Sequence, residues 1–348
     1  MVVQREDVQR QYTTVTVLEK LLGGITAVSL QVAAVDLGLP DRLAAGPKPV
    51  RELAAETGTQ EDVLLLFLRA LTSEEVFQEV EPGVFANTEA SRCLCADAPG
   101  SLHGIAQLVM ADWTREVWDP RELLHTLRTG EPAFEHVFGE DFWSFLSARP
   151  EQYAVFSRAQ SIFSGPKDEA IAGAYDFAGI STLVDVGGGE GSLLGTILRE
   201  HPGMTGILFD RPPVADRVRG RVRKLGLAGR YRCVGGDFFH EVPAGGDAYL
   251  LKQVLHDWSD EESGRILLNC RAAMAPAGRI LVAAYVVPEP PSKPLKYLMA
   301  GLWVRLNCRG GYERTERQFR AVFEAAGLEL VRVLPTASTH SILEARVG

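Results

Sequence analysis

The amino-terminal part of the chain has the pattern of helices followed by a short hairpin. Apolar residues recur at helical intervals from Val8 to about Leu43, which predicts two apolar helices. Residues 50–71 predict two short amphipathic helices joined at Gly58, and residues 74–91 predict two short strands around the Pro82-Gly83 turn. Helix, turn, helix and β-hairpin is the order of a winged-helix element, so we expect one within an otherwise helical domain.

The pattern changes near residue 175. Residues 100–178 continue as helices rich in aromatic side chains, whereas from Ser181 onward short apolar runs alternate with amphipathic segments of helical length. We therefore predict a helical domain with a winged-helix element over 1–100, a further helical region that links it to the rest over 101–175, and an α/β domain over 176–348.

The α/β domain is expected to hold seven strands. A Rossmann-like, doubly wound parallel sheet fits this alternation of strands and helices. The last two strands are separated by only five residues, too few for a parallel crossover, so we expect them to form an antiparallel hairpin that gives the sheet an antiparallel edge strand. The predicted strands are 182–187, 205–210, 230–237, 247–254, 279–287, 328–334 and 340–347.

Composition and charge narrow the class of protein. The chain has 348 residues, of which 46% are hydrophobic and 23% charged, the balance of a folded globular protein. Its longest apolar run, Ile280–Val287, is too short for a transmembrane helix, and charged residues stand at the amino terminus before any apolar stretch. We expect a cytoplasmic protein with no membrane partner. The net charge of −9 disfavours nucleic acid as a partner.

The five cysteines support that placement. Their number is odd and none stands in a CxxC pair, so we expect free thiols and no metal site.

The strongest chemical signal is the segment LVDVGGGEGSLL, residues 183–194, in which a strand meets glycines and then a helix. Glycines let the backbone approach a ligand closely, and the amino end of the following helix suits polar or anionic groups. The glycines Gly187, Gly189 and Gly191 follow G-x-G-x-G, which departs from the dinucleotide pattern G-x-G-x-x-G. Packing alone also produces such turns, so this loop is one part of a larger case.

Acidic residues end the next two strands. Asp210 follows the second strand, where a carboxylate can accept two ribose hydroxyls, although a solvated loop acid would look the same. The third strand ends in Gly236, Asp237 and Phe238, where the acid can accept from an adenine amino group and the ring can cover its face. Ligands of open α/β sheets bind beyond the carboxyl ends of the strands, so these ends predict a nucleoside site.

The fourth strand places a histidine at the same edge. His256 follows directly after it, and Ser259 with Glu262 forms a capping box that predicts a helix from about Asp260. We therefore expect His256 in the turn between strand and helix, in a catalytic role. Lys252 lies on the strand itself, where it either borders the cofactor or pairs with a neighbouring acid.

These motifs, in this order, resemble the class I S-adenosylmethionine-dependent O-methyltransferases of the caffeic acid and acetylserotonin type, including bacterial enzymes that tailor natural products. The likeness covers nearly the whole chain. It implies that residues 1–100 form a dimerisation domain and that residues 101–175 contribute to the acceptor pocket. It is carried by VDVGGGEGS, LFDRPPV, GGDFF, LLKQVLHDWSDEES and GGYERTERQFRAVFEAAGL.

The resemblance implies the cofactor S-adenosylmethionine and a set of residues that hold it. The methionine part would contact Asp185 and the loop of Gly187, Gly188 and Gly189. The ribose would contact Asp210. The adenine would lie at Gly236, Asp237 and Phe238, with Lys252 at the border of the site.

The resemblance also implies His256 as the general base, oriented by two acids. Glu313 matches the second acid, but Ala284 stands where the family has Glu or Asp. A carboxylate beside the imidazole fixes its tautomer and stabilises its charged form. His256 is therefore expected to keep at most one of the two carboxylates that orient it in the family. Asp257 is a possible substitute, although adjacent side chains leaving a strand point apart. Some relatives bind the cofactor yet carry out decarboxylation or hydroxylation, which stays open as an alternative.

The expected acceptor is a small hydroxylated molecule of aromatic or polyketide type. Its pocket is predicted among apolar side chains of the helical region and of the late helix around 297–307, with ordinary core packing as the alternative for each of them. The candidates are Trp143, Phe156, Phe163, Met299, Trp303 and Asn307.

Two further expectations concern partners. A winged-helix regulator is the alternative of a different class, but residues 51–92 hold three Arg against nine Asp and Glu, whereas DNA-binding surfaces cluster Lys and Arg. The apolar helices over roughly 17–43 offer more hydrophobic surface than a small domain covers, so we expect a homodimer, with a self-contained helical core as the alternative.

Overall fold

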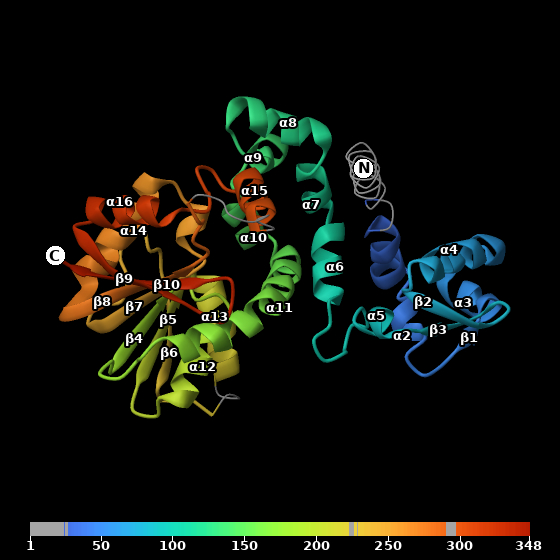
Figure 1. Cartoon of the computed structure of the whole chain (residues 1–348), viewed down its shortest axis with the longest axis horizontal. Helices are drawn as coiled ribbons and strands as arrows, with labels where there is room; N and C mark the ends of the chain where they lie inside the picture. Colours follow the sequence, from blue (N-terminus) through green and yellow to red (C-terminus); the bar gives the residue numbers. More distant parts are fainter. Residues whose placement is uncertain (1–23, 25–26, 223–225, 228, 290–296) are drawn as a thin grey trace, which may run out of the picture. The chain divides into compact units, whose positions relative to one another are not determined.

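The computed structural model describes residue 24 and residues 27–222, 226–227, 229–289 and 297–348. These divide into two compact units, with the division between Thr114 and Arg115. It falls inside the region 101–175 for which a separate helical segment is predicted. Most of the first predicted apolar helix lies outside the described residues. Figure 1 shows the path of the chain through both units.

The amino-terminal unit has the predicted order of two helices and a hairpin. Its core is formed where α3 and α4 pack against the hairpin β2–β3, around Leu53, Leu68 and Phe85. Strand β1 pairs with β3 and makes a three-stranded sheet in the order β1-β3-β2, a strand that the pattern does not predict. The elements are η1 (Val32–Asp36), α2 (Leu39–Arg42), β1 (Lys48–Pro49), α3 (Val50–Thr57), α4 (Glu61–Ser73), β2 (Phe77–Glu81), β3 (Val84–Asn87), α5 (Glu89–Arg92) and α6 (His103–Met110).

Helices dominate the start of the second unit, as predicted. Helix α11 is the longest among the described residues and contains Pro166. It packs against α10 and against α12, the helix that follows the glycine loop. The helices are α7 (Asp112–Val117), which crosses the division, α8 (Pro120–Thr129), α9 (Ala133–Phe138), α10 (Phe142–Ala148) and α11 (Pro150–Ala174).

The seven-stranded sheet of this unit has the order β6-β5-β4-β7-β8-β10-β9 (Figure 1). The first five strands in this order are parallel, and β10 runs antiparallel to both of its neighbours. The predicted hairpin at one edge is therefore confirmed, with β9 as the outermost strand. The strands are β4 (Thr182–Val186), β5 (Thr205–Asp210), β6 (Tyr231–Gly235), β7 (Gly246–Lys252), β8 (Met274–Ala284), β9 (Leu328–Pro335) and β10 (Ser341–Val347).

The sheet is covered on both faces, which confirms the doubly wound architecture. One core joins Val184 and Val186 of β4 to α14 and α16. The other joins Leu183 of the same strand to α11, α12 and α13. Alternate residues of β4 thus serve opposite cores, as the two-residue period of a strand requires. The helices are α12 (Ser192–Glu200), α13 (Pro212–Val222), α14 (Asp260–Ala273), α15 (Tyr297–Asn307) and α16 (Glu316–Ala325).

The turn after β7 differs from the sequence prediction. The strand was predicted to run to residue 254, but it ends at Lys252, and Gln253 takes a left-handed conformation with φ of 54°. A short 3-10 helix, η3 (Leu255–Asp257), follows. The predicted capping box is confirmed, because the Ser259 hydroxyl accepts from the Glu262 N–H and the Glu262 carboxylate accepts from the Ser259 N–H. Helix α14 begins at Asp260 as predicted.

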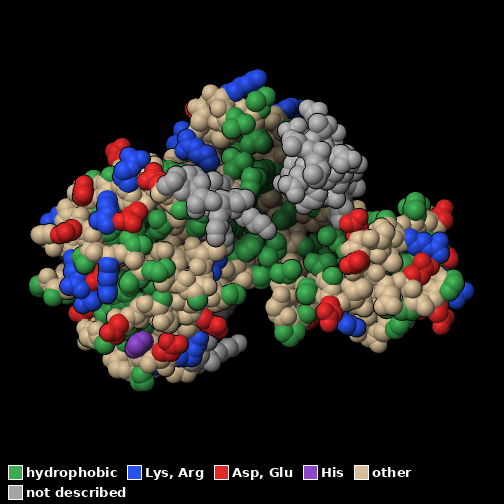
Figure 2. Space-filling model, viewed as in Figure 1, with side chains coloured by type: hydrophobic (Ala, Val, Ile, Leu, Met, Phe, Trp, Pro, Cys, Tyr) green, Lys and Arg blue, Asp and Glu red, His purple; other side chains and the backbone are tan. Residues whose placement is uncertain are grey.

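The helices, the cysteines and the surface charges each have a property that bears on the sequence predictions. The helices of the described residues include none that is both long and apolar enough to cross a membrane. All five cysteines are free thiols. On the face shown in Figure 2, acidic and basic side chains are interspersed over each unit.

Candidate active site

The carboxyl ends of the parallel strands bring the predicted cofactor residues to one edge of the sheet. The Gly189 N–H donates to Oδ2 of Asp210 at 2.9 Å, which joins the glycine loop after β4 to the end of β5. The Gly236 N–H donates to the carbonyl of Asp210 at 3.0 Å and joins the end of β6 to the same residue. Asp210 thus stands at the centre of the three strand ends that the sequence placed together.

The glycine loop needs its glycines for two reasons. Gly187, Gly189 and Gly191 have positive φ values of 68°, 56° and 75°. Space is the second reason, since a Cβ on Gly188 would lie 2.7 Å from Oδ2 of Asp185, and a Cβ on Gly191 would collide with the Tyr231 hydroxyl. Larger residues would therefore both strain the backbone and displace the side chains beneath the loop.

Asp185 is buried under this loop as an isolated acid within β4. It is 2% exposed. Burial raises the pKa of its carboxyl to about 7, with Lys252 opposing the rise and the negative charges of Asp168 and Asp210 adding to it. A carboxyl poised between its two forms at neutral pH is sensitive to any charge placed above it.

Lys252 pairs with an acid that the sequence analysis missed. Its Nζ lies 2.6 Å from Oδ1 of Asp168 on α11, and Asp168 is only 2% exposed. The Ser192 hydroxyl, in the first turn of α12, donates to the other oxygen of this carboxylate. Asp168 therefore ties the end of β7, helix α11 and the helix after the glycine loop together. The helical pattern of α11 holds no signal that sets Asp168 apart from a surface acid.

The predicted adenine residues occupy the end of β6 and the turn after it. Asp237 accepts from the Phe239 N–H at 2.8 Å, and its side chain is 52% exposed. The ring of Phe238 packs edge-on against Phe239 and Trp258. The acid thus stands at the surface, and the ring is anchored beside the turn that carries His256.

His256 lies between two carboxylates, one at each ring nitrogen. Its Nδ1–H donates to Oε1 of Glu313 at 2.9 Å, and its Nε2 is 3.4 Å from Oδ1 of Asp257. The side chains of all three are 13% exposed or less. Burial alone would lower the pKa of His256, but Asp257 and Glu313 outweigh it and raise that pKa to about 9. Burial raises the pKa of Asp257 to about 6, against the opposing effect of His256.

Three of the predicted acceptor residues form an aromatic cluster. Phe156 of α11 stacks on Trp303 of α15 at 6.3 Å between centroids and meets Trp143 of α10 edge-on at 5.8 Å. Phe142 packs edge-on against Trp303. Helix α15 also contacts the η3 turn, which places the cluster on a helix adjoining His256. The Nε1 of Trp143 is buried and has no hydrogen-bond partner among the described residues.

The other three predicted acceptor residues have different environments. Phe163 and Met299 are 45% and 61% exposed. Asn307 is buried at the end of α15, where its Nδ2 donates to the Trp303 carbonyl at 2.7 Å. Its Oδ1 is buried without a hydrogen-bond partner in the part of the chain that the structure describes. The structure thus gathers Trp143, Phe156 and Trp303, and leaves an unsatisfied acceptor on Asn307.

A second buried histidine lies at the same edge of the sheet. His340 is 2% exposed and precedes Ser341, which pairs with Ala284 at the end of β8. Burial lowers the pKa of His340 to about 3, and the charges of Lys167, His256 and Lys252 add to the effect, so this imidazole is neutral. His340 precedes its strand in the sequence, so it lacks the signal of a residue that directly follows a parallel strand. Because β10 is antiparallel, its beginning lies at the edge where the parallel strands end.

Comparisons with known proteins match both units. A family model described as an O-methyltransferase domain matches residues 120–329, and one described as an O-methyltransferase dimerisation domain matches residues 19–97. The chain is 42% identical to the phenazine O-methyltransferase PhzM of Lysobacter antibioticus, over 94% of this chain and 95% of that protein. The chain belongs to the O-methyltransferase family.

Solved structures support the family assignment. A structure of the mitomycin 7-O-methyltransferase MmcR superposes with a TM-score of 0.90 at 37% identity, covering 98% of this chain and all of that one. An O-methyltransferase of neocarzinostatin biosynthesis, in complex with S-adenosylmethionine, superposes with a TM-score of 0.80 at 31% identity, over 93% and 96% of the two chains. A phenazine-1-carboxylate N-methyltransferase of Pseudomonas aeruginosa is 34% identical over 81% of this chain and 83% of its own.

The O-methyltransferase family assignment settles the class of protein. This chain is an S-adenosylmethionine-dependent enzyme of secondary metabolism, and the amino-terminal unit corresponds to the family's dimerisation domain. The alternative of a winged-helix regulator is therefore set aside. The glycine loop fits the cofactor, since nothing lies within 4 Å of the Cβ position of Gly189, the buried acid Asp185 lies beneath the loop and the half-buried Asp210 lies beside it.

Asp257 takes the position of a second acid beside His256 in this O-methyltransferase, an alternative that the sequence left open. With Ala284 in place of an acid, His256 keeps Glu313 at Nδ1, and Asp257 lies at its other ring nitrogen. The reason is that the chain has already left β7 at His256 and turned into η3, so the rule that adjacent strand residues point apart does not apply. Asp257 therefore reaches the imidazole of its neighbour.

Proposed function

We propose that this O-methyltransferase methylates a hydroxyl of an aromatic or polyketide-like small molecule, with His256 as the general base. The observation that carries the proposal is the position of His256 between Glu313 and Asp257. Glu313 engages Nδ1, which leaves Nε2 to accept the proton of the acceptor. At 3.4 Å, Asp257 is beyond the usual hydrogen-bond distance of about 2.9 Å and acts on Nε2 through its charge.

The raised pKa of His256 matches the base to a phenolic acceptor. A phenol has a pKa of about 10 and an ordinary histidine one of about 6.5, so proton transfer between them costs about 5 kcal/mol. With the pKa of His256 at about 9, the same transfer costs about 1.4 kcal/mol. The two carboxylates thus make His256 a stronger base. At neutral pH most enzyme molecules hold His256 protonated, and they must lose that proton before they react.

The cofactor residues are proposed from the strand ends. Asp210 and the loop of Gly187, Gly188 and Gly189 would hold the ribose and the methionine part, with Asp185 beneath the loop. Gly236, Asp237 and Phe238 would hold the adenine. Lys252, fixed by Asp168, would border the site. Bound S-adenosylmethionine supplies an electrophilic methyl group, and the chain supplies alignment of the acceptor oxygen, an effect that can contribute several kcal/mol.

The acceptor is proposed to lie against the aromatic cluster of Trp143, Phe156 and Trp303. Stacked and edge-on rings favour a flat apolar ligand. The free Oδ1 of Asn307 would accept a hydrogen bond from a polar substituent of the acceptor. Phe163 and Met299 would contribute from the exposed side of their helices.

A mass-spectrometric assay tests this proposal. The protein is incubated with S-adenosylmethionine and a panel of hydroxylated phenazines, naphthoates and benzoates, each paired with its amino analogue. We expect methylated phenol and S-adenosylhomocysteine in equal amounts. Methylation of the amino analogues alone would show that a nitrogen, and not an oxygen, receives the methyl group. An acceptor altered without S-adenosylhomocysteine would contradict methyl transfer and favour decarboxylation or hydroxylation.

We also propose that the enzyme is a homodimer. The match of residues 19–97 to the family's dimerisation domain supports it. Light scattering at micromolar concentration is expected to give twice the mass of the 38.0 kDa chain. A mass of one chain under the same conditions would contradict the proposal.

A further inference from the structure

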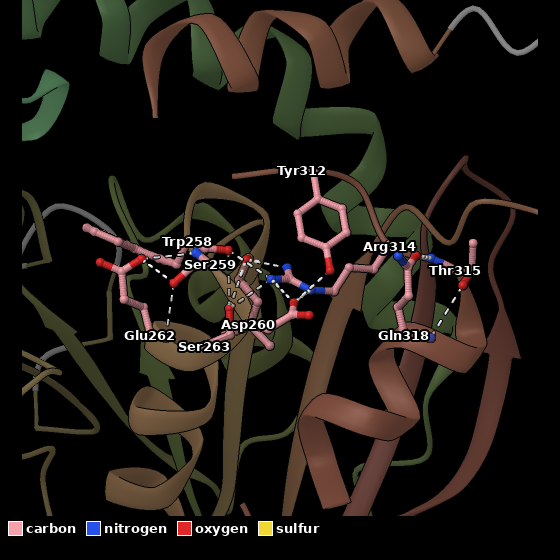
Figure 3. A network of polar contacts seen from close by, with 10 residues as sticks. Trp258, Ser259, Asp260, Glu262, Ser263, Tyr312, Arg314, Thr315 and Gln318 are labelled. Carbon is pink, nitrogen blue, oxygen red and sulfur yellow. Dashed lines mark hydrogen bonds and ion pairs between the residues drawn. The ribbon is translucent and has the colours of Figure 1, made fainter. Parts of the chain in front are cut away.

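We propose that Arg314 is a positioning residue that holds His256 against Glu313. This inference rests on the proposed function, since it assigns the support of the proposed base. Arg314 follows Glu313 directly in the chain and is only 1% exposed. Figure 3 shows its guanidinium between Asp260, Trp258 and Ser263, below the ring of Tyr312.

The guanidinium binds the turn of His256 on both sides of the catalytic residues. Its Nη1 donates to the Leu255 carbonyl at 2.6 Å, and its Nη2 donates to the Trp258 carbonyl at 2.8 Å. Leu255 and Trp258 are the residues immediately before and after the pair His256-Asp257. One rigid, planar group therefore fixes both ends of the segment that carries the base and its second carboxylate.

The same residue is anchored in the segment that carries Glu313. The Arg314 carbonyl accepts from the Val287 N–H at 2.9 Å, and Thr315 forms a capping box with Gln318 at the start of α16. The backbone around Glu313 is thus fixed to the extension of β8 and to a helix. Because the Arg314 side chain reaches back to the turn after β7, the distance between His256 and Glu313 is set through this one side chain as well as through their own contact.

The charge of Arg314 is balanced at the surface and not by the catalytic acids. Its Nε lies 2.9 Å from Oδ1 of Asp260, which also accepts from the Tyr312 hydroxyl at 2.7 Å. The Tyr312 ring covers the guanidinium at 4.4 Å. The Asp260 side chain is 57% exposed. Glu313 therefore keeps its carboxylate for His256, and the buried cation is satisfied by a different acid.

The test is a pair of substitutions with a matched control. Arg314→Lys keeps the positive charge but loses the planar fork, because an ammonium cannot reach both carbonyls and Asp260 at once. Asp260→Asn weakens the anchoring of the guanidinium from the exposed side and perturbs folding less. Arg317→Lys is the control, since Arg317 is an 80% exposed arginine of α16 that pairs with Glu289.

Two readouts separate positioning from mere structural support. For Arg314→Lys we expect kcat to fall about 10- to 100-fold with an unchanged KM for S-adenosylmethionine, the scale of a small displacement of a catalytic group. The positive charge of Arg314 itself lowers the pKa of His256, and lysine keeps that charge, so a further fall reports lost contact with Glu313 and Asp257. We expect NMR titration of the imidazole to show this pKa falling from about 9 toward about 6.5. Asp260→Asn should give smaller changes in the same directions, and Arg317→Lys none.

The outcomes are distinguishable from failure of the proposed function. The inference is overturned if Arg314→Lys and Asp260→Asn both keep the wild-type titration of His256 and a kcat within twofold. If Arg314→Lys does not fold, Asp260→Asn decides by the same criteria. The NMR titration needs no turnover, so it tests the positioning of His256 even if wild-type enzyme were to methylate none of the acceptors.

Discussion

The Nδ1 of His256 lies 2.9 Å from Oε1 of Glu313, although the two residues are 57 positions apart in the chain. One stands in the turn after β7 and the other in the segment between α15 and α16. His256 lies in the short 3-10 helix η3, and Glu313 lies in irregular backbone. In the proposal above, the polar network around Arg314 holds the two residues together. The chemistry proposed for this enzyme depends on that contact.

Glu313→Gln should weaken the base. The substitution removes a negative charge and a charge-assisted hydrogen bond that raise the pKa of His256, so this pKa should fall below about 9. In the pH dependence of kcat/KM, the rise toward alkaline pH should therefore level off at a lower pH than in the wild type. We expect kcat to fall about 10- to 100-fold. An unchanged pH profile would contradict the role of Glu313.

Ala284→Glu should not improve the enzyme. Ala284 is 5% exposed in the core that joins β8 to α14 and α16, so a carboxylate there should lower the free energy of unfolding by about 1 to 3 kcal/mol. Because His256 already has two carboxylates, we expect kcat to rise by no more than about twofold. Ala284→Gln, of the same size and uncharged, is the control. A tenfold gain in kcat for Ala284→Glu, without a gain for Ala284→Gln, would show that His256 lacks an orienting carboxylate.

Cofactor binding should depend on pH through Asp185. The pKa of this carboxyl is raised to about 7, so the free enzyme holds it largely protonated below pH 7, and the positive charge of S-adenosylmethionine favours the ionised form. The Kd for S-adenosylmethionine should therefore fall as the pH rises from 6 to 7 and level off above pH 7. Calorimetry in buffers of different ionisation enthalpy should measure the proton that is released on binding. Asp185→Asn should abolish this dependence, whereas Asp216→Asn, at an exposed site, should keep it.

Gly188→Ala should weaken cofactor binding selectively. The new Cβ would lie 2.7 Å from Oδ2 of Asp185 and 3.1 Å from Cδ1 of Leu208, so the carboxylate beneath the loop must move. We expect the Kd for S-adenosylmethionine to rise about tenfold, which corresponds to about 1.4 kcal/mol. Gly220→Ala is the control, because a Cβ there meets nothing within 4 Å. Equal effects of the two substitutions would contradict the fit of the loop.

Much of the fold follows from local pattern. The apolar run of β4, the glycines after it and the helix beginning at Ser192 are all specified within about a dozen residues, so the cofactor edge of the sheet was predicted closely. The capping box at Ser259 likewise marks the start of α14 without tertiary information. The hairpin of β9 and β10 followed from the shortness of their connection.

The missed features all depend on tertiary structure. Asp168 meets Lys252 across 84 residues, and nothing in the helical pattern of α11 distinguishes it from a surface acid. Asp257 was named from the sequence as a substitute acid, but the geometry of a strand argued against it, and that strand ends five residues earlier, at Lys252. His340 lies at the site because β10 is antiparallel, a direction that moves the start of a strand to the edge where its neighbours end.

The most direct test of the account is single-turnover methyl transfer by His256→Ala, measured beside its affinity for S-adenosylmethionine. His201→Asn serves as the control, since His201 follows α12 at the opposite edge of the sheet. We predict a loss of about 10²- to 10⁴-fold in the rate with a phenolic acceptor, an unchanged Kd for the cofactor and wild-type behaviour of the control. A His256→Ala enzyme that transfers the methyl group at the wild-type rate would contradict the central claim.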